Sequence, residues 1–340
     1  TSITAADSFT FTGTLHGTTA TTIADGVNLT TTAAKAAGKT ISDGTDTGTV
    51  TLTALHSTLG ADLSGVDANT VTAAFDGNGT FTGDIGNAVV TVGDGNTLTT
   101  TAAKASGKTI NEAGGDDATT TITALHSTLA ANLSGITTNA VTAAFDGNGT
   151  FTGNLGTAVV TVGNNNTLTA TAAVVTGKTI TEAAETNATT TITALHSTLA
   201  ADLSGIDTNA VTAAFGGNGT FTGDLGTAVV TVADNVSLTG AANKLVGHTI
   251  NKSGTGDNNG AIVVTLNAAA DTAVDLTQLT GNAAITSITA ADSFTFTGTL
   301  HGTVATTVAN GVTFTSAASV VTSKTIGGDG SVAITNLDAD

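Results

Sequence analysis

The chain has 340 residues, a net charge of −18 at pH 7 and only 10% charged residues. It contains no Cys, Met, Trp, Tyr, Pro or Arg, which excludes disulfides, thiol nucleophiles, thiolate metal sites and arginine clamps on phosphate. Its 8 basic residues against 26 acidic ones would repel a phosphate backbone, so nucleic acid is not expected as a partner. Without Met, the chain is expected to be a processed product or a segment of a longer one.

Apolar residues make up 40% of the chain, which is too many for a typical disordered segment, so a folded protein is expected. Thr and Val are abundant and favour strands, and 42 Gly with many Asn and Asp supply turns. Gly and Thr interrupt nearly every candidate helix. No apolar run reaches the roughly 18 residues of a transmembrane helix. The composition therefore predicts an all-β chain without a transmembrane segment.

Tandem repeats organise the chain from its first residue. The heptapeptide TALHSTL begins at Thr53, Thr123 and Thr193, which is a period of 70 residues. Residues 1–18 recur unchanged at 286–303, an offset of 285. The predicted repeat cassettes are 1–70, 71–140, 141–210, 211–285, which is longer and divergent, and 286–340, which is partial and restarts the 285-residue block. We expect the chain to be a window cut from a longer tandem array.

Each cassette contains three related segments, each with a stretch of alternating apolar and polar residues and an Asx-Gly or small-residue turn. Dividing the cassette by three gives about 23 residues, a plausible length for one coil of a solenoid. The prediction is a parallel β-solenoid, a β-helix-like rod of about 15 coils in which equivalent residues form ladders. Tandem small β-sandwich domains are the alternative; they are disfavoured because such domains bury little surface and no linker separates the cassettes.

Gly-Lys-Thr recurs at 38–40, 107–109 and 177–179 and resembles the end of a phosphate-binding loop. Ala33, Ala102 and Ala172 stand where that loop requires its first Gly. The tripeptide is therefore interpreted as a turn that enters a strand.

His56, His126 and His196 occupy equivalent places, but three coils would separate them by roughly 14 Å, which is too far to share a metal ion. Ser57 follows His56 directly. Neighbours on a strand point to opposite faces, which argues against a nucleophile and its base.

Asp76, Asn78, Asp146 and Asn148 are weak candidates for calcium binding, because they place oxygen atoms at alternating positions. Phe81 stands where a calcium loop needs its Gly, and no Glu closes the loop. Asx side chains that bond their own backbone in β-turns are the alternative. The glutamates Glu112, Glu182 and Glu185 are expected in an exposed loop. No other cofactor is expected.

In composition and texture the chain resembles the repetitive regions of giant bacterial secreted or cell-surface proteins, such as adhesins, S-layer-like proteins and filament-forming β-repeat proteins. The resemblance rests on threonine-rich, acidic, cysteine-free tandem repeats such as VTAAFDGNGTFTG and TALHSTLAADLSGI. It implies secretion, an extracellular or cell-surface location, and a mechanical or adhesive role.

The sequence thus predicts a structural extracellular protein and no enzyme: a rod that forms a filament, stalk or surface layer and associates with itself end to end or laterally. The alternative is an adhesin region that binds glycans or another surface. An ice-binding or a polysaccharide-cleaving solenoid is a further alternative.

Overall fold

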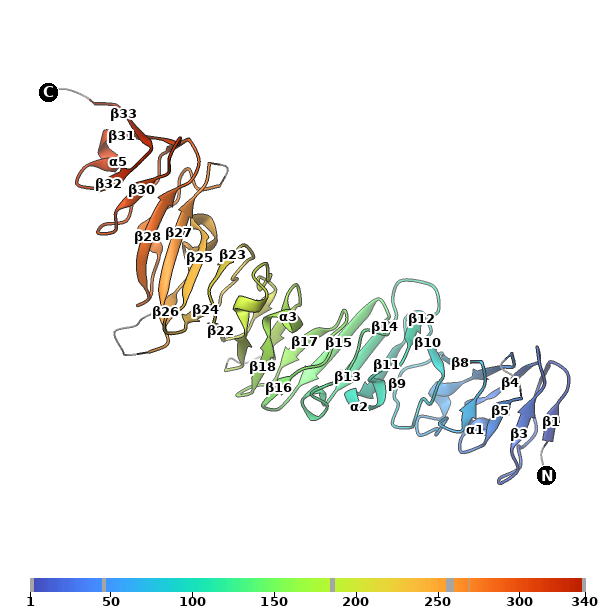
Figure 1. The fold of residues 1–340 in the computed structure, drawn as a ribbon. Helices are drawn as coiled ribbons and strands as arrows, with labels where there is room; N and C mark the ends of the chain where they lie inside the picture. The colour runs from blue at the N-terminus through green and yellow to red at the C-terminus, as the bar shows by residue number, and fades with distance from the viewer. Residues whose placement is uncertain (1–2, 45–46, 184–186, 255–259, 269, 338–340) are drawn as a thin grey trace. The chain divides into compact units, whose positions relative to one another are not determined.

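A computed structural model describes residues 3–44, 47–183, 187–254, 260–268 and 270–337 (Figure 1). In these ranges the strands pair in parallel and stack as a β-solenoid of about 16 turns, which confirms the predicted fold class. The chain divides into two compact units. Unit 1 comprises residues 1–168 and 179–185, and unit 2 comprises residues 169–178 and 186–340.

Strands form where apolar and polar residues alternate, because successive side chains point to opposite faces. In β6 (Thr49–Thr53) the side chains of Val50 and Leu52 are fully buried, while the three Thr lie on the outer face. β13 (Thr119–Thr123) shows the same pattern with Thr120 and Ile122 inside. Each of these two strands thus contributes two inward side chains to a core that the neighbouring turns complete.

The remaining strands and helices of unit 1 follow in chain order. They are β1 (Ile3–Ala5), β2 (Phe9–Thr10), β3 (Thr21–Ile23), β4 (Asn28–Thr32), α1 (Ala33–Ala36), β5 (Ile41–Asp43), the 3₁₀ helix η1 (Leu55–Ser57), β7 (Val66–Asp67), β8 (Thr70–Phe75), β9 (Gly79–Thr80), β10 (Val89–Val92), β11 (Thr97–Thr101), α2 (Ala102–Ala105), β12 (Ile110–Glu112), η2 (Leu125–Ser127), β14 (Ile136–Thr137), β15 (Ala140–Phe145), β16 (Gly149–Phe151), β17 (Val159–Val162) and β19 (Ile180–Glu182).

β18 (Thr167–Thr171) contains a boundary between the units. The elements of unit 2 are α3 (Ala172–Val175), β20 (Thr189–Thr193), η3 (Leu195–Ser197), β21 (Ile206–Asp207), β22 (Ala210–Phe215), β23 (Gly219–Phe221), β24 (Val229–Val232), β25 (Ser237–Ala241), α4 (Ala242–Leu245), β26 (Ile250–Lys252), β27 (Ala261–Leu266), η4 (Leu276–Gln278), β28 (Ala284–Ala290), β29 (Phe294–Phe296), β30 (Thr306–Val308), β31 (Thr313–Ala317), α5 (Ala318–Val321), β32 (Ile326–Gly328) and β33 (Ser331–Thr335).

Neighbouring strands in a sheet mostly differ by two in their numbers, because a turn contributes one strand to each of two sheets. Unit 1 contains the orders β1-β3-β5-β7, β14-β12-β10-β8-β6-β4-β2 and β19-β17-β15-β13-β11-β9. Unit 2 contains β20-β22-β24-β26, β23-β25-β27-β28-β30-β32 and β29-β31-β33.

The turns differ from the expected 23-residue coil. Ala73 lies beside Val90, Val90 beside Ile110 and Ile110 beside Ile136, so these turns advance the chain by 17, 20 and 26 residues. Seven strands recur in each 70-residue cassette, as in β1 to β7 and β8 to β14, and each turn uses two of them. A cassette is therefore three and a half turns, and not three.

The first strand of a cassette pairs with its two neighbours in one sheet through shifted sets of residues. In β8, residues 70–73 pair with β6, while residues 72–75 pair with β10. β15 divides its pairing between β13 and β17 in the same way. Because each of these cassettes has an odd number of strands, strands with the same place in successive cassettes, such as β4 and β11, lie in different sheets.

Candidate functional site

The residues expected to bind calcium lie on the loop between β8 and β9 and its counterpart between β15 and β16. Asn78 Oδ1 accepts the backbone N–H of Thr97 on the next turn at 2.7 Å. Asn148 Oδ1 accepts the N–H of Thr167 at 2.6 Å. Each amide oxygen thus continues the hydrogen-bond ladder one step beyond the strand. The same oxygen is the atom that a calcium ion would need as a ligand.

Other side chains take the same place in other cassettes. Ser8 Oγ accepts the N–H of Asn28 at 2.9 Å, and Ser293 Oγ accepts the N–H of Thr313 at 2.8 Å. Asn218 Oδ1 accepts the N–H of Ser237 at 2.7 Å. Ser offers a single oxygen and still makes the same bond, so the shared property of these residues is a short side-chain acceptor.

Asp76 and Asp146, the carboxylates of the candidate calcium sites, are exposed. Among the described residues, no three His, Asp or Glu side chains are grouped closely enough to hold a metal ion. Calcium binding by these four residues stays a prediction, to be tested by its effect on melting temperature.

The equivalent histidines lie in η1, η2 and η3 and pack edge-on against the phenylalanines at the ends of β8, β15 and β22. The ring centroids of His56 and Phe75 are 6.3 Å apart at an interplanar angle of 84°. The pairs His126–Phe145 and His196–Phe215 repeat this geometry at 6.3 Å.

His56 and Ser57 do not point to opposite faces, because they lie on a 3₁₀ helix and not on a strand. Ala54, at a left-handed φ of 56°, ends the strand direction before η1. His56 Nε2 is consequently 3.1 Å from Ser57 Oγ. His56 Nδ1 is buried without a hydrogen-bond partner, so no third group orients the ring as a carboxylate does in a catalytic triad.

Each histidine ring packs closely against a glycine. A Cβ added at Gly77 would lie 2.8 Å from the ring of His56. In the fourth cassette Gly216 stands at the position equivalent to Asp76, and its N–H donates to Nδ1 of His196, in the third cassette, at 3.3 Å. The histidines therefore serve as packing residues between turns.

The Gly-Lys-Thr tripeptides form the turn between each short helix and the next strand, as predicted. Gly38, Gly107 and Gly177 have left-handed φ values of 66°, 70° and 64°, a conformation that glycine adopts without strain. Lys108 Nζ donates to the carbonyl of Gly86 on the preceding turn at 2.6 Å. Its half-buried ammonium group thus bonds the backbone of a neighbouring turn.

Asx side chains close a tight corner in each cassette. Asp62 Oδ1 accepts the N–H and the hydroxyl of Ser64 at 3.0 and 2.6 Å. These two bonds, the hydroxyl first, lower the pKa of the Asp62 carboxyl. Asn132 makes the same pair of bonds to Ser134 without a charge. The corner thus requires an acceptor oxygen and not an anion.

The glutamate Glu112 also has a structural role. Its Oε1 accepts the N–H of Ala118 at 3.1 Å, and its Oε2 accepts the N–H of Asn139 on the next turn at 2.9 Å. Glu182 has a partner as well, and Glu185 lies outside the described residues.

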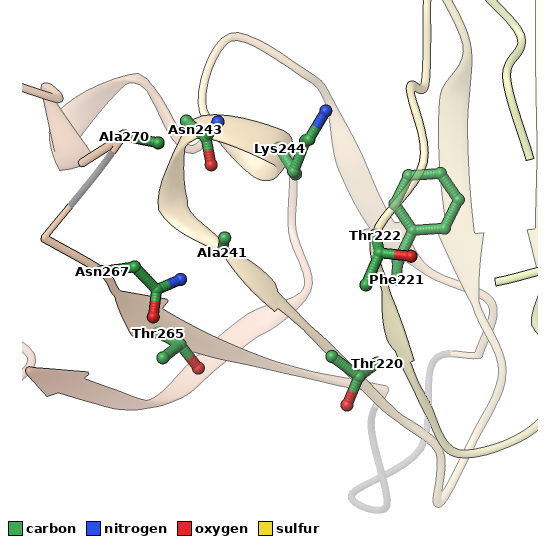
Figure 2. A pocket seen from close by; sticks show the side chains of 9 residues that line it. All are labelled: Thr220, Phe221, Thr222, Ala241, Asn243, Lys244, Thr265, Asn267 and Ala270. Carbon is green, nitrogen blue, oxygen red and sulfur yellow. The ribbon is translucent and has the colours of Figure 1, made fainter. Parts of the chain in front are cut away.

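A surface hollow of about 480 Å³ lies in unit 2 (Figure 2). Figure 2 shows Asn243 and Lys244 on α4 at one side, Thr265 and Asn267 on and after β27, and Thr220 and Thr222 at the other side. Phe221, Ala241 and Ala270 complete its lining, which is mainly apolar.

Asp271 bonds the backbone of two residues that line this hollow. Its side chain is fully buried, and its two carboxylate oxygens accept the N–H groups of Asn243 and Asn267, both at 2.7 Å. Sequence reasoning missed Asp271. The signal was the loss of TALHSTL in the fourth cassette, where the sequence of residues 265–275 reads TLNAAADTAVD.

None of the helices in the described ranges is long and apolar enough to cross a membrane. No known protein-family model matches the chain, and comparisons with curated proteins and with solved structures found no match either. The function is therefore argued from the geometry of the chain itself.

Proposed function

We propose that the chain is a structural module of an extracellular or cell-surface protein, with no enzymatic activity of its own, whose stacked turns extend the protein as part of a filament, stalk or surface layer. One observation carries the proposal: recurring polar side chains bond the backbone of a neighbouring turn or close a corner within their own turn. Asn78 and Asn148 reach the next turn, Lys108 reaches the previous one, and Asp62 closes a corner.

The composition supports the same role. A solenoid grows by adding turns, each of which needs only a few inward apolar residues and polar residues that complete the ladder. The Thr, Val and Ala of the chain serve these two purposes, as in β6, where Val50 and Leu52 point inward and the three Thr point outward. Function then depends on length and regularity.

The test of the structural role is the shape of the purified chain. Small-angle scattering should give an elongated particle. A compact particle would contradict the proposal. Immunolabelling of intact, unpermeabilised source cells should stain the cell surface; labelling only after permeabilisation would contradict the location.

The second candidate function is glycan binding, and the hollow beside Lys244 is the observation that favours it. Its apolar lining with amide, hydroxyl and ammonium groups at the rim offers the mixed contacts that a sugar uses. A glycan array with the wild-type chain and with Lys244→Ala tests it. Lys104→Ala is the matched control, because Lys104 has the same place in α2. Binding that Lys244→Ala does not weaken would exclude the hollow as the site.

A further inference from the structure

The hollow in unit 2 lies where the fourth cassette departs from the first three. On α4, Asn243 takes the place that Ala34 has on α1 and Ala103 has on α2. The heptapeptide TALHSTL of the first three cassettes is absent from the fourth, where residues 267–271 read NAAAD. The residues that distinguish this cassette, Asn243, Asn267 and Asp271, are the ones that meet beside the hollow.

Two side-chain amides in the hollow are available to a ligand. Asn243 is exposed and Asn267 is half-buried, and both line the hollow near Ala241 (Figure 2). Neither side-chain amide makes a hydrogen bond to another residue that the structure describes. An amide side chain offers one acceptor oxygen and two N–H donors. The hollow therefore presents two groups that can each accept and donate a hydrogen bond.

One buried carboxylate anchors the backbone that carries both amides. Asp271 accepts the N–H of Asn243 with Oδ1 and the N–H of Asn267 with Oδ2, both at 2.7 Å. Its own N–H donates to the carbonyl of Asn267 at 3.1 Å. Burying a carboxylate is costly unless hydrogen bonds satisfy its oxygens, and here both oxygens are bonded. A ligand thus meets a pair of amides whose backbone positions are already fixed, which lowers the entropic cost of binding.

The charges around the hollow favour a neutral ligand. Among the described residues that line it, Lys244 alone is charged. Hydrogen bonds from Ser204, the hydroxyl first, and to a lesser degree the ammonium of Lys244 lower the pKa of Asp202, so an exposed carboxylate lies near that ammonium. The carboxylate of Asp271 lies behind the amides, and the chain as a whole has a charge of −18. One ammonium does not offset the repulsion that these charges exert on an acidic ligand.

We propose that the hollow binds a neutral sugar, whose hydroxyl groups bond the side-chain amides of Asn243 and Asn267 and whose C–H face lies on Ala241 and Ala270. Hydroxyl groups donate and accept, as the amides do, and the mainly apolar lining suits the C–H face. The volume of about 480 Å³ falls within the roughly 300–1,000 Å³ of ordinary ligand sites. This inference rests on the glycan-binding function proposed above and names the class of sugar and the residues that recognise it.

A glycan array tests the class of sugar. It should carry neutral oligosaccharides of hexoses and N-acetylhexosamines beside oligosaccharides with uronate, sialic acid or sulfate groups. The wild-type chain should bind neutral sugars. Its affinity for the strongest of them, measured by titration calorimetry, should change little with ionic strength, because the ligand has no charge to be screened. Binding confined to acidic sugars would overturn the proposal.

Variants of the two amides test the site with that same neutral sugar. Asn243→Ala gives α4 the residue that α1 and α2 have at this place, so the fold should be kept. It should weaken binding about fivefold, the effect of one lost hydrogen bond. Asn267→Ala is the second, independent variant. Ser319→Ala is the matched control, because Ser319 has the same place on α5 and does not line the hollow.

Asp271→Asn tests the positioning role of the buried carboxylate. It leaves one acceptor oxygen for two N–H groups. Amide hydrogen exchange at Asn243 or Asn267 should become faster, and binding of the neutral sugar should weaken with it. Faster exchange at these two residues with an unchanged affinity would overturn the role of Asp271.

The outcomes separate the proposals. An array on which the wild-type chain binds no sugar overturns this inference and the glycan-binding function, and the structural role then stands or falls by the shape of the particle. Neutral-sugar binding that Asn243→Ala and Ser319→Ala weaken equally would leave glycan binding intact and overturn the two amides as its site. Urea midpoints equal to that of the wild type show that a weaker affinity does not come from unfolding.

Discussion

Replacing Asn148 tests whether side chains, and not ions, connect one turn to the next. Asn148 Oδ1 accepts the Thr167 N–H at 2.6 Å, and this bond is exposed. Asn148→Ala removes the acceptor and leaves the N–H to water. Loss of an exposed side-chain cap of this kind costs about 1 kcal/mol. Because the bond joins neighbouring turns, the cost should appear first as local opening at Thr167.

Amide hydrogen exchange measures that opening at the affected residue. A loss of about 1 kcal/mol corresponds to roughly fivefold faster exchange at Thr167. Asn148→Ser is the matched variant, since Ser8 and Ser293 make the same bond with a hydroxyl at 2.9 and 2.8 Å. It should keep most of the protection.

Two results would refute this reasoning. The first is exchange at Thr167 that is as fast in Asn148→Ser as in Asn148→Ala. The second is protection in the wild-type chain that rises on adding calcium and falls on chelation, which would assign the Asn148 oxygen to an ion.

Phe145→Ala removes a fully buried ring and should cost about 3–5 kcal/mol, seen as a lower urea midpoint; a loss below about 1 kcal/mol would mean that the site collapses. Ala124→Gly relieves a left-handed φ of 54° and should raise stability by up to about 1 kcal/mol in the same assay, whereas a lower midpoint would contradict strain at this corner. Burial, and then Lys324, lowers the pKa of His301 below 6.5; its contribution to stability is present above pH 6.5 and falls as the pH drops toward the lowered pKa, so melting temperature should fall with pH more steeply than in His301→Asn. The pKa of Asp62 is also lowered, so its contribution to the free energy of unfolding is present above pH 3.8 and is lost as the pH falls through the lowered pKa. Any stability advantage of the wild type over Asp62→Asn should therefore vanish at acid pH, and a difference that persists there would contradict the reasoning.

Much of the fold could be predicted because its determinants are local. In residues 49–53, TVTLT, the alternation of Thr with Val and Leu defines both a strand and its inner face. The 70-residue period indicates stacked, equivalent structures, and a chain with small β-branched residues and frequent turns favours short parallel strands. The turn at Gly107 was likewise predictable, since its neighbours end a short helix and begin a strand.

The number of turns per cassette was not predictable from the period. β7, β9 and β14 are strands of only two residues, too short to show an alternating pattern. They become strands because neighbouring turns supply hydrogen-bond partners. The sequence shows three segments in a cassette, whereas the structure has seven strands and therefore three and a half turns.

The candidate sites show the same limit. The sequence places His56 beside Ser57, but only the left-handed corner at Ala54 decides that the two side chains meet. The sequence places a side-chain oxygen at Asn78, but the neighbouring turn decides that this oxygen accepts the Thr97 N–H. The buried carboxylate of Asp271 depends on backbone N–H groups 28 and 4 residues away.

The sequence by itself determined the strand pattern, the cassette period and the restriction to a few residue types without thiol or guanidinium chemistry. Tertiary structure alone decided the half-turn shift and the partners of the recurring polar side chains. The physical reason is that alternation and turn formation act between neighbours in the chain. Stacking instead joins residues about one turn apart. The partner that a side chain meets there depends on the length and path of the chain between the two residues.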